Sequence, residues 1–296
     1  MRKTAKGLVD SVVVPAVSHT GPFRRLISYV GRSVSADGYG ALRDQFVANG
    51  KQSTWDCDIR REIVRRFETV DRTLEAATSP TDGLFLAEAV LSMKATGDMV
   101  ECGCYNGTST AKLSIVASLI GRKLHVFDSF EGLPSEDGGF VKEYHIRRSS
   151  SRIGWRAGDY AAGLEKVRSN IERLGEIGAC RFFKGWFSQT LTPQNLPSEI
   201  AVAFVDVDMP SSARDCLAAI WPAMTQGAVY FSHDVAFINV LKAILDRRLW
   251  IDQLNEYPPI LFGAGFGMGD SSPHLGFFVK GEDVETDYIN SITLEK

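Results

Sequence analysis

The segment at residues 100–110, VECGCYNGTST, constrains the fold of this chain more strongly than any other stretch. Apolar residues lead into it and an apolar run at 111–120 follows it, so the segment predicts a buried strand, a tight turn and a helix. Gly103 and Gly107 stand four residues apart in the turn. A backbone that passes close beneath a ligand needs residues without a Cβ atom at such points, and the segment therefore predicts a ligand-binding turn.

The spacing of these glycines indicates what kind of ligand the turn holds. The dinucleotide fingerprint is G-x-G-x-x-G, which holds a diphosphate, and the first glycine of that pattern is missing here. Glu101 stands near the strand end, where a carboxylate suits an amino group or sugar hydroxyls better than a diphosphate. S-adenosylmethionine is such a ligand; the alternative is a glycine turn that serves only packing. The predicted cofactor residues of this turn are Glu101, Gly103, Tyr105, Asn106, Gly107 and Thr108, and Thr108 or Ser109 is expected to cap the helix.

A second candidate segment lies about 20 residues further on. Residues 124–127 form a short apolar strand that ends at Asp128, within the motif FDSFEGLP. An acidic residue at the tip of the second strand holds the ribose diol in doubly wound sheets, so Asp128 is a candidate ribose ligand. The alternative is that Asp128 is an ordinary turn residue.

Composition limits the classes of protein to which the chain can belong. Of its 296 residues, 44% are hydrophobic and 23% are charged, which is typical of a soluble globular protein. The net charge of −3 gives no basic excess, so a nucleic-acid partner is not expected. No stretch approaches the ~20 apolar residues of a membrane span. The apolar stretch at 7–17 is interrupted by Asp10 and Pro15 and lacks a clear cleavage site, so export is not expected.

The five cysteines are an odd number and include no C-x-x-C spacing. They predict buried, reduced thiols in a cytoplasmic protein. Cys102 and Cys104 flank Gly103, and the alternation of a strand would point both side chains the same way.

Apolar strands alternate with helical patterns through most of the chain, which predicts an α/β fold with a doubly wound, mostly parallel sheet. Two apolar segments near the C-terminus, at 260–262 and 275–279, predict an antiparallel hairpin at the sheet edge. The stretch at 135–158 is predicted to be a long functional or mobile loop. Further strands are predicted at 124–127, 181–184, 201–205 and 228–231, and helices at 160–174, 211–224 and 237–248.

The first 80 residues have a helical but irregular pattern, and we expect two units: a helical N-terminal extension at 1–80 and a cofactor-binding domain at 81–296. The extension is predicted to act as a substrate lid or a subunit contact, and the protein is expected to form a homo-oligomer. An amphipathic helix is predicted at 58–77. Its arginines form either a solvated basic face or, for one of them, a contact to substrate: Arg60, Arg61, Arg65, Arg66 and Arg72.

Acidic residues and a histidine follow two strands that are expected to be neighbours. Asp206 closes the strand at 201–205, and His233 and Asp234 close the strand at 228–231. Because ligands bind at the carboxyl ends of such strands, these three side chains predict a divalent-metal site that could bind a substrate hydroxyl. The alternative is that they are capping and turn residues.

His145 is a candidate general base. It lies in the predicted loop near the rim of the site, and an imidazole has a suitable pKa for taking a proton from a hydroxyl. A lone histidine in a loop is equally consistent with a surface residue.

Four of these segments together carry a family resemblance. The motifs VECG at 100–103, FDSFEGLP at 127–134, KGWF at 184–187 and the stretch from Asp206 to Asp234 resemble the macrocin O-methyltransferase family (TylF/MycF type). The resemblance covers about residues 82–280. It implies a class I, Rossmann-like fold and an S-adenosylmethionine-dependent enzyme that methylates sugar hydroxyls with a divalent metal, usually Mg²⁺.

The resemblance also implies roles for single residues. His233 departs from the family, in which an Asp-Asp pair occupies positions 233 and 234, and an imidazole suits Mn²⁺ or another first-row ion better than Mg²⁺. The alternative is that His233 is not a metal ligand and acts as a base itself. The implied roles are the cofactor turn for Glu101, Gly103 and Gly107, the ribose end for Asp128 and Ser129, the adenine side for Gly185 and Trp186, metal ligation for Asp206, His233 and Asp234, and the general base for His145.

We therefore predict a metal-dependent S-adenosylmethionine O-methyltransferase that acts on a saccharide or a glycosylated small molecule. A phenolic or catechol acceptor is the nearest alternative, since such enzymes also place a metal at these strand ends. A nicotinamide-dependent oxidoreductase is a remote alternative, because the dinucleotide fingerprint is incomplete. A cofactor-binding scaffold without activity is disfavoured by the intact acidic cluster.

Overall fold

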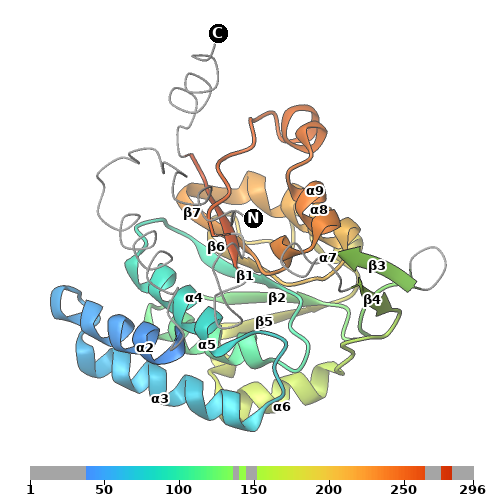
Figure 1. The fold of residues 1–296 in the computed structure, drawn as a ribbon. Coiled ribbons are helices and arrows are strands. Elements are labelled where there is room, and N and C mark those ends of the chain that lie inside the picture. The colour runs from blue at the N-terminus through green and yellow to red at the C-terminus, as the bar shows by residue number, and fades with distance from the viewer. Residues whose placement is uncertain (1–37, 136–139, 145–151, 264–274, 282–296) are drawn as a thin grey trace, which may run out of the picture.

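The computed structural model describes residues 38–135, 140–144, 152–263 and 275–281, and its centre is a six-stranded sheet (Figure 1). The strand order is β5-β2-β1-β6-β7-β8, in which every pair is parallel except the last, β7 with β8. This confirms the prediction of a mostly parallel, doubly wound sheet with an antiparallel edge. The strands are β1 (Asp98–Cys102), β2 (Leu124–Asp128), β5 (Cys180–Lys184), β6 (Ile200–Val205), β7 (Met224–Ser232) and β8 (Gly276–Val279).

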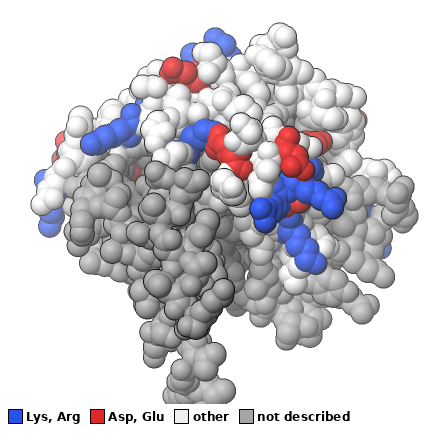
Figure 2. Space-filling model, turned by 90° about the horizontal axis from the view of Figure 1, so that it is seen from above, with Lys and Arg blue, Asp and Glu red and all other residues white. Residues whose placement is uncertain are grey.

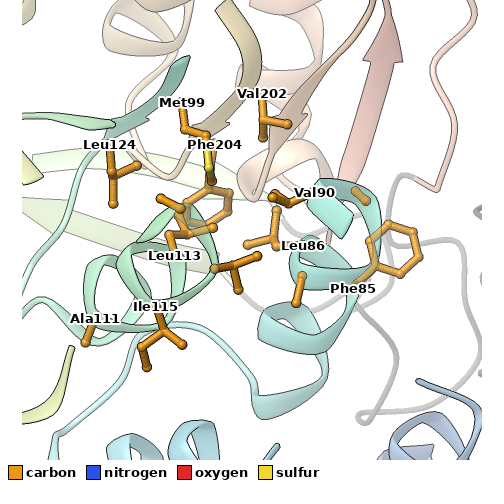
Figure 3. Packing of buried hydrophobic residues seen from close by; sticks show 14 of the residues in the cluster. Phe85, Leu86, Val90, Met99, Ala111, Leu113, Ile115, Leu124, Val202 and Phe204 are labelled. Atoms are coloured by element: carbon orange, nitrogen blue, oxygen red, sulfur yellow. The ribbon is translucent and has the colours of Figure 1, made fainter. Parts of the chain in front are cut away.

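Helices cover both faces of this sheet because the strands are apolar on both sides. Alternate residues of β6 enter different clusters: Val202 and Phe204 pack with one group of helices, and Ala203 and Val205 with the other. Figure 3 shows part of the first cluster, where side chains of two helices meet Met99, Leu124, Val202 and Phe204 of the strands. The first face carries α4 (Pro80–Ser92), α5 (Thr108–Leu119) and α6 (Leu164–Leu174), and the second carries α8 (Pro210–Ile220) and α9 (Ile238–Ile244).

The C-terminal edge differs in detail from the predicted hairpin. β8 pairs with β7 in an antiparallel register that sets Phe277 opposite Phe231. The segment at 260–262 forms no strand, and its Phe262 makes only an isolated antiparallel bridge to Phe277. β8 therefore lies between β7 and this segment.

Two short strands lie within the stretch that the sequence predicts to be a loop. β3 (Phe140–Tyr144) and β4 (Arg152–Arg156) pair antiparallel, with Phe140 opposite Arg156, and form a separate two-stranded sheet. Their sequences, FVKEY and RIGWR, mix charged and apolar residues, which hides the strand pattern. The remaining elements are α7 (Phe187–Thr190), the 3₁₀ helices η1 (Asn49–Gln52), η2 (Ile177–Ala179), η3 (Trp221–Ala223) and η4 (Asp234–Ala236), and the π-helix η5 (Leu249–Gln253).

The described part of the N-terminal extension packs on the first face of the sheet domain. α2 (Gly38–Ala48) and α3 (Cys57–Thr73) contribute to the same hydrophobic cluster as α4 and α5. Arg60 is fully buried and donates to the carboxylate of Glu88 at 2.5 Å, so its assignment to a solvated basic face was wrong. A guanidinium at this depth is retained because a carboxylate compensates its charge.

The described part of the face in Figure 2 shows no strong excess of either positive or negative side chains. Figure 2 shows Lys and Arg beside Asp and Glu side chains across the described part of one face. Among the described residues, no helix is both long and apolar enough to cross a membrane.

Candidate functional site

A cavity opens at the carboxyl ends of the parallel strands, where the strand order changes direction between β1 and β6. It encloses about 730 Å³ of empty space, including the part that is open to solvent. The cavity brings together the following residues that the sequence predicts as functional: Gly103, Tyr105, Thr108, Asp128, Ser129, Gly185, Trp186 and Asp206.

The turn after β1 forms the floor of this cavity and needs a glycine at its first position. Gly103 has φ +82°, and a Cβ atom there would lie 1.9 Å from the carbonyl oxygen of Asp206. The Asp206 N–H donates to the carbonyl of Cys102 at 2.9 Å, which holds the turns after β1 and β6 against each other. A residue without a side chain is therefore required where these two backbones meet.

The start of α5 differs from the sequence prediction. Gly107, with φ +83°, is the N-cap residue and no side chain caps the helix. Thr108 donates instead to the carbonyl of Glu75 at 3.0 Å. A Cβ atom on Gly107 would meet Val167 of α6 at 3.1 Å, so this glycine permits helix packing behind the turn and does not line the cavity.

Asp128 connects the first two turns of the site. One carboxylate oxygen accepts from the N–H of Cys104 at 2.7 Å, and the other accepts from the N–H of Phe130 at 2.6 Å. Because each carboxylate oxygen has further lone pairs, Asp128 can still accept hydroxyl donors from a ligand in the cavity. Its neighbour Ser129 also lines the cavity and donates to the carbonyl of Gly132 at 2.8 Å.

Glu101 lies fully buried behind the turn, and neither of its carboxylate oxygens makes a hydrogen bond within the described part of the chain. Burial raises the pKa of Glu101 from 4.5 to about 8, and the negative charges of Asp128 and Asp206 also raise this pKa. The nearby side chains of Ser109 and Thr110 lower it, but by less. A buried carboxylate without a partner is costly. A ligand that places a hydrogen-bond donor or a positive charge beside the turn would compensate it.

Replacement of Glu101 by Gln is expected to stabilise the cofactor-free protein against unfolding at alkaline pH. The folded chain keeps a proton on Glu101 up to about pH 8, whereas the unfolded chain releases it near pH 4.5. Folding stability therefore falls as the pH rises between these two values, by a few kcal/mol (about 1.4 per pKa unit), and Glu101→Gln removes this loss. Thermal melts at about pH 5.5 and about pH 8.5 measure it. Equal shifts of the melting temperature at both pH values would contradict the argument.

The predicted metal residues come together behind the cavity. One ligand atom from each of Asp206, His233 and Asp234 lies within 4.8 Å of the others. The Nδ1 atom of His233 is 3.2 Å from an oxygen of Asp206 and 3.9 Å from one of Asp234. Of the three, only Asp206 lines the cavity. Two carboxylate oxygens and one imidazole nitrogen at these separations form a donor set that fits a first-row divalent ion.

The electrostatics of His233 depend on the carboxylates around it. Burial lowers the pKa of His233, but the carboxylates of Asp206 and Asp82 outweigh burial and raise this pKa well above its ordinary value. Burial and the charge of Asp206 also raise the pKa of Asp234 to about 7. Since the carboxylates raise the pKa of His233 and repel one another, the cluster attracts positive charge.

Asp208 and Tyr160 are among the cavity residues that the sequence did not predict. Both adopt positive φ angles, +57° and +59°. Tyr105, a third lining residue, has φ +45° and packs edge-on against Tyr160 with ring centroids 5.4 Å apart. Residues other than glycine in this strained conformation tend to cluster at functional sites. The signal for Asp208 was its position two residues after Asp206.

The carboxylates near Asp208 and Tyr160 also shift the pKa values of these two residues. Burial and the neighbouring carboxylates of Asp234 and Asp206 raise the pKa of Asp208 well above its ordinary value. Burial, followed by the charge of Asp208, raises the pKa of Tyr160 to about 12. Tyr160 therefore stays a neutral phenol, and Asp208 is a stronger proton acceptor than an exposed aspartate.

The opposite wall is built by the end of β5. Gly185 has φ +146° and donates its N–H to the carbonyl of Asp128 at 3.0 Å. Trp186 follows it, lines the cavity and is 36% exposed, so its ring offers a flat surface to a ligand. Asn106 is buried and does not line the cavity, while His145 lies outside the described residues.

The doubly wound sheet defines a Rossmann-like fold, and its ligand cavity combines a glycine turn without a diphosphate fingerprint with acidic strand ends. A family model described as "Macrocin-O-methyltransferase (TylF)" matches residues 85–253. This is more than half of the chain, and the protein therefore belongs to the macrocin O-methyltransferase family and is an O-methyltransferase.

Several solved structures are similar to the chain. The O-methyltransferase NovP is 20% identical, with a TM-score of 0.49, and the match covers 81% of this chain and 98% of NovP. The calicheamicin methyltransferase CalS11 is 14% identical, with a TM-score of 0.44, and covers 90% of this chain and 96% of its own. A Podospora anserina methyltransferase bound to S-adenosylhomocysteine, PaMTH1, is 14% identical with a TM-score of 0.40, over 68% of this chain and 71% of its own. No curated protein matches the sequence.

Proposed function

We propose that this protein transfers the methyl group of S-adenosylmethionine to a hydroxyl of a saccharide or a glycosylated small molecule, and that it needs a divalent metal. One observation carries the proposal: a single cavity joins the predicted cofactor residues of β1, β2 and β5 to Asp206 of the acidic cluster. Membership of the macrocin O-methyltransferase family supports methyl transfer to an oxygen atom as the reaction type.

The cofactor half of the cavity lies between the turn after β1 and the end of β5. We propose that the backbone at Gly103 approaches the methionine part, that Asp128 binds the ribose hydroxyls, and that Trp186 packs on the adenine. The partnerless carboxylate of Glu101 supports a positively charged group beside the turn, as in the ammonium of S-adenosylmethionine. Proposed cofactor residues with less direct support are Tyr105, Asn106, Gly107, Thr108, Ser129 and Gly185.

The acceptor half lies at the wall formed by Asp206, Asp208 and Tyr160. A divalent ion held by Asp206, His233 and Asp234 would supply a Lewis acid that lowers the pKa of an acceptor hydroxyl. Asp208 lines the cavity, and burial with its acidic neighbours raises its pKa, which makes its carboxylate a stronger proton acceptor than an exposed aspartate. His145, the base predicted from sequence, competes with Asp208 for this role, and the single variants of each residue distinguish them.

Residues 1–80 are proposed to act as a lid or a subunit contact, and the protein to form a homo-oligomer. Light scattering of the full chain and of a chain lacking residues 1–37 tests the second statement. A change from oligomer to monomer on truncation supports a subunit contact, whereas an unchanged oligomer with altered acceptor KM supports a lid.

Labelled methyl transfer tests the proposed function directly. Purified protein is incubated with labelled S-adenosylmethionine, with Mg²⁺, Mn²⁺ or EDTA, and with panels of glycosides and catechols. We expect label in glycosides, loss of transfer in EDTA, and S-adenosylhomocysteine binding by calorimetry. Label only in catechols would move the acceptor to the phenolic class, and binding of NADH without S-adenosylhomocysteine would overturn the proposal.

A further inference from the structure

His233 is held from both sides of its ring, and one of its partners comes from a distant part of the chain. Its Nε2 atom is 3.3 Å from a carboxylate oxygen of Asp82, which lies in the first turn of α4, 151 residues away in sequence. Its Nδ1 atom faces Asp206 and Asp234. The ring therefore connects the N-terminal side of the sheet domain to the acidic cluster.

Asp82 is itself rigidly placed. It is fully buried, and the carboxylate oxygen that faces His233 also accepts from the N–H of Ser79 at 2.9 Å and from its hydroxyl at 2.7 Å. The bond from the Ser79 N–H and the bond that the Asp82 N–H donates to the Ser79 hydroxyl oxygen at 3.3 Å form the capping box that starts α4. A carboxylate fixed by a helix start cannot follow the imidazole, so the imidazole must orient to it.

The hydrogen bond to Asp82 decides which nitrogen of His233 is available. A carboxylate accepts the Nε2–H and leaves the Nδ1 lone pair directed at the cluster. Metal-bound histidines almost always donate their second N–H to such an acceptor. Asp234 is oriented in the same way, since one oxygen accepts from the N–H groups of Val207 at 2.9 Å and Asp208 at 2.8 Å while the other faces His233.

We propose that Asp82 is a positioning residue that sets His233 as a nitrogen ligand, and that the resulting site selects Mn²⁺ or a later first-row ion over Mg²⁺. This inference rests on the metal site of the proposed function and adds its selectivity. Mg²⁺ prefers an octahedron of oxygen ligands, whereas imidazole nitrogen favours Mn²⁺ and the ions that follow it. The competing arrangement is a doubly protonated His233 that donates to Asp82 and Asp206 and occupies the place of an ion.

Direct detection of the nitrogen ligand needs no variant. Mn²⁺ is added to the full-length protein with S-adenosylhomocysteine, and pulsed electron paramagnetic resonance is recorded with natural and ¹⁵N-histidine-labelled protein. We expect modulation from a directly coordinated imidazole nitrogen that changes with the isotope. Bound Mn²⁺ without nitrogen coupling, or no bound Mn²⁺, would overturn the inference.

Calorimetric titration with Mn²⁺ and Mg²⁺ then tests selectivity and the role of Asp82. Asp82→Asn, which keeps a capping side chain, is expected to weaken Mn²⁺ binding by about 10- to 100-fold. His233→Asp is expected to shift the Mn²⁺/Mg²⁺ affinity ratio at least tenfold toward Mg²⁺. Asp98→Asn is the matched control, because Asp98 makes the same kind of contact to a histidine, at 3.2 Å to Nε2 of His125, at the opposite end of β1.

Each outcome is decisive, and cofactor binding separates this inference from the proposed function. An unchanged Mn²⁺/Mg²⁺ affinity ratio in His233→Asp would overturn the inference. Equal loss of Mn²⁺ affinity in Asp82→Asn and Asp98→Asn would also overturn it. If the wild-type protein binds S-adenosylhomocysteine but no metal, the inference fails while the cofactor assignment stands. If it binds neither, the proposed function fails.

Discussion

Asp206→Asn is expected to lower methyl transfer by about 10²- to 10³-fold or more while S-adenosylhomocysteine binds within about twofold of the wild type. Asp206 is the one member of the acidic cluster that also lines the cavity, so it connects the charge of the cluster to the acceptor. The amide has the same shape but loses the negative charge. Single-turnover transfer and calorimetry measure the two quantities separately.

The control for this prediction is an aspartate at the other end of the same sheet. Asp98→Asn removes a carboxylate from the start of β1, far from the cavity, and should leave transfer unchanged. Near-normal turnover by Asp206→Asn would remove this residue from the mechanism. A large loss of S-adenosylhomocysteine affinity would show that Asp206 supports the cofactor turn more than the chemistry.

Gly103→Ala is expected to abolish cofactor binding and to lower the free energy of unfolding by about 2–5 kcal/mol. The φ angle of +82° costs any L-residue with a Cβ atom, and the new atom would lie 1.9 Å from the Asp206 carbonyl. Either the turn after β1 or the turn after β6 must move, and both line the cavity. Urea unfolding and S-adenosylhomocysteine titration measure the two effects.

Gly121→Ala separates the clash from the backbone strain. Gly121 has a similar φ of +70°, but no atom lies within 4 Å of a Cβ placed there. It should cost only the conformational penalty of about 1–2 kcal/mol and leave cofactor binding intact. Equal losses in both variants would mean that the contact with Asp206 contributes nothing.

Much of the parallel core could be predicted from sequence, because β6 is a continuous apolar run and β2 and β7 contain shorter ones. The prediction for Cys102 and Cys104 was wrong for a local reason. Cys102 packs in the second hydrophobic cluster and Cys104 in the first, because the positive φ of Gly103 interrupts the alternation of the strand. Spacing alone does not reveal a backbone angle.

The rest of the site depends on contacts between distant segments. Nothing local to Asp82 indicates that it meets His233, and nothing local to Arg60 indicates that Glu88 compensates its charge. The strands β3 and β4 escaped detection because they pair only with each other. The roles of single residues, including His145, stay predictions.

The contact between Gly103 and the Asp206 backbone has a consequence for engineering. The two turns touch and share a hydrogen bond, so neither can shift without the other. Under the proposed function, the main chain would therefore fix the spacing between methyl donor and acceptor oxygen. New acceptors are best sought by randomising Tyr160, which lies outside both turns, lines the cavity and packs edge-on against the Tyr105 ring. Libraries that spare the two turns should broaden acceptor choice and keep the transfer rate for the acceptors that fit.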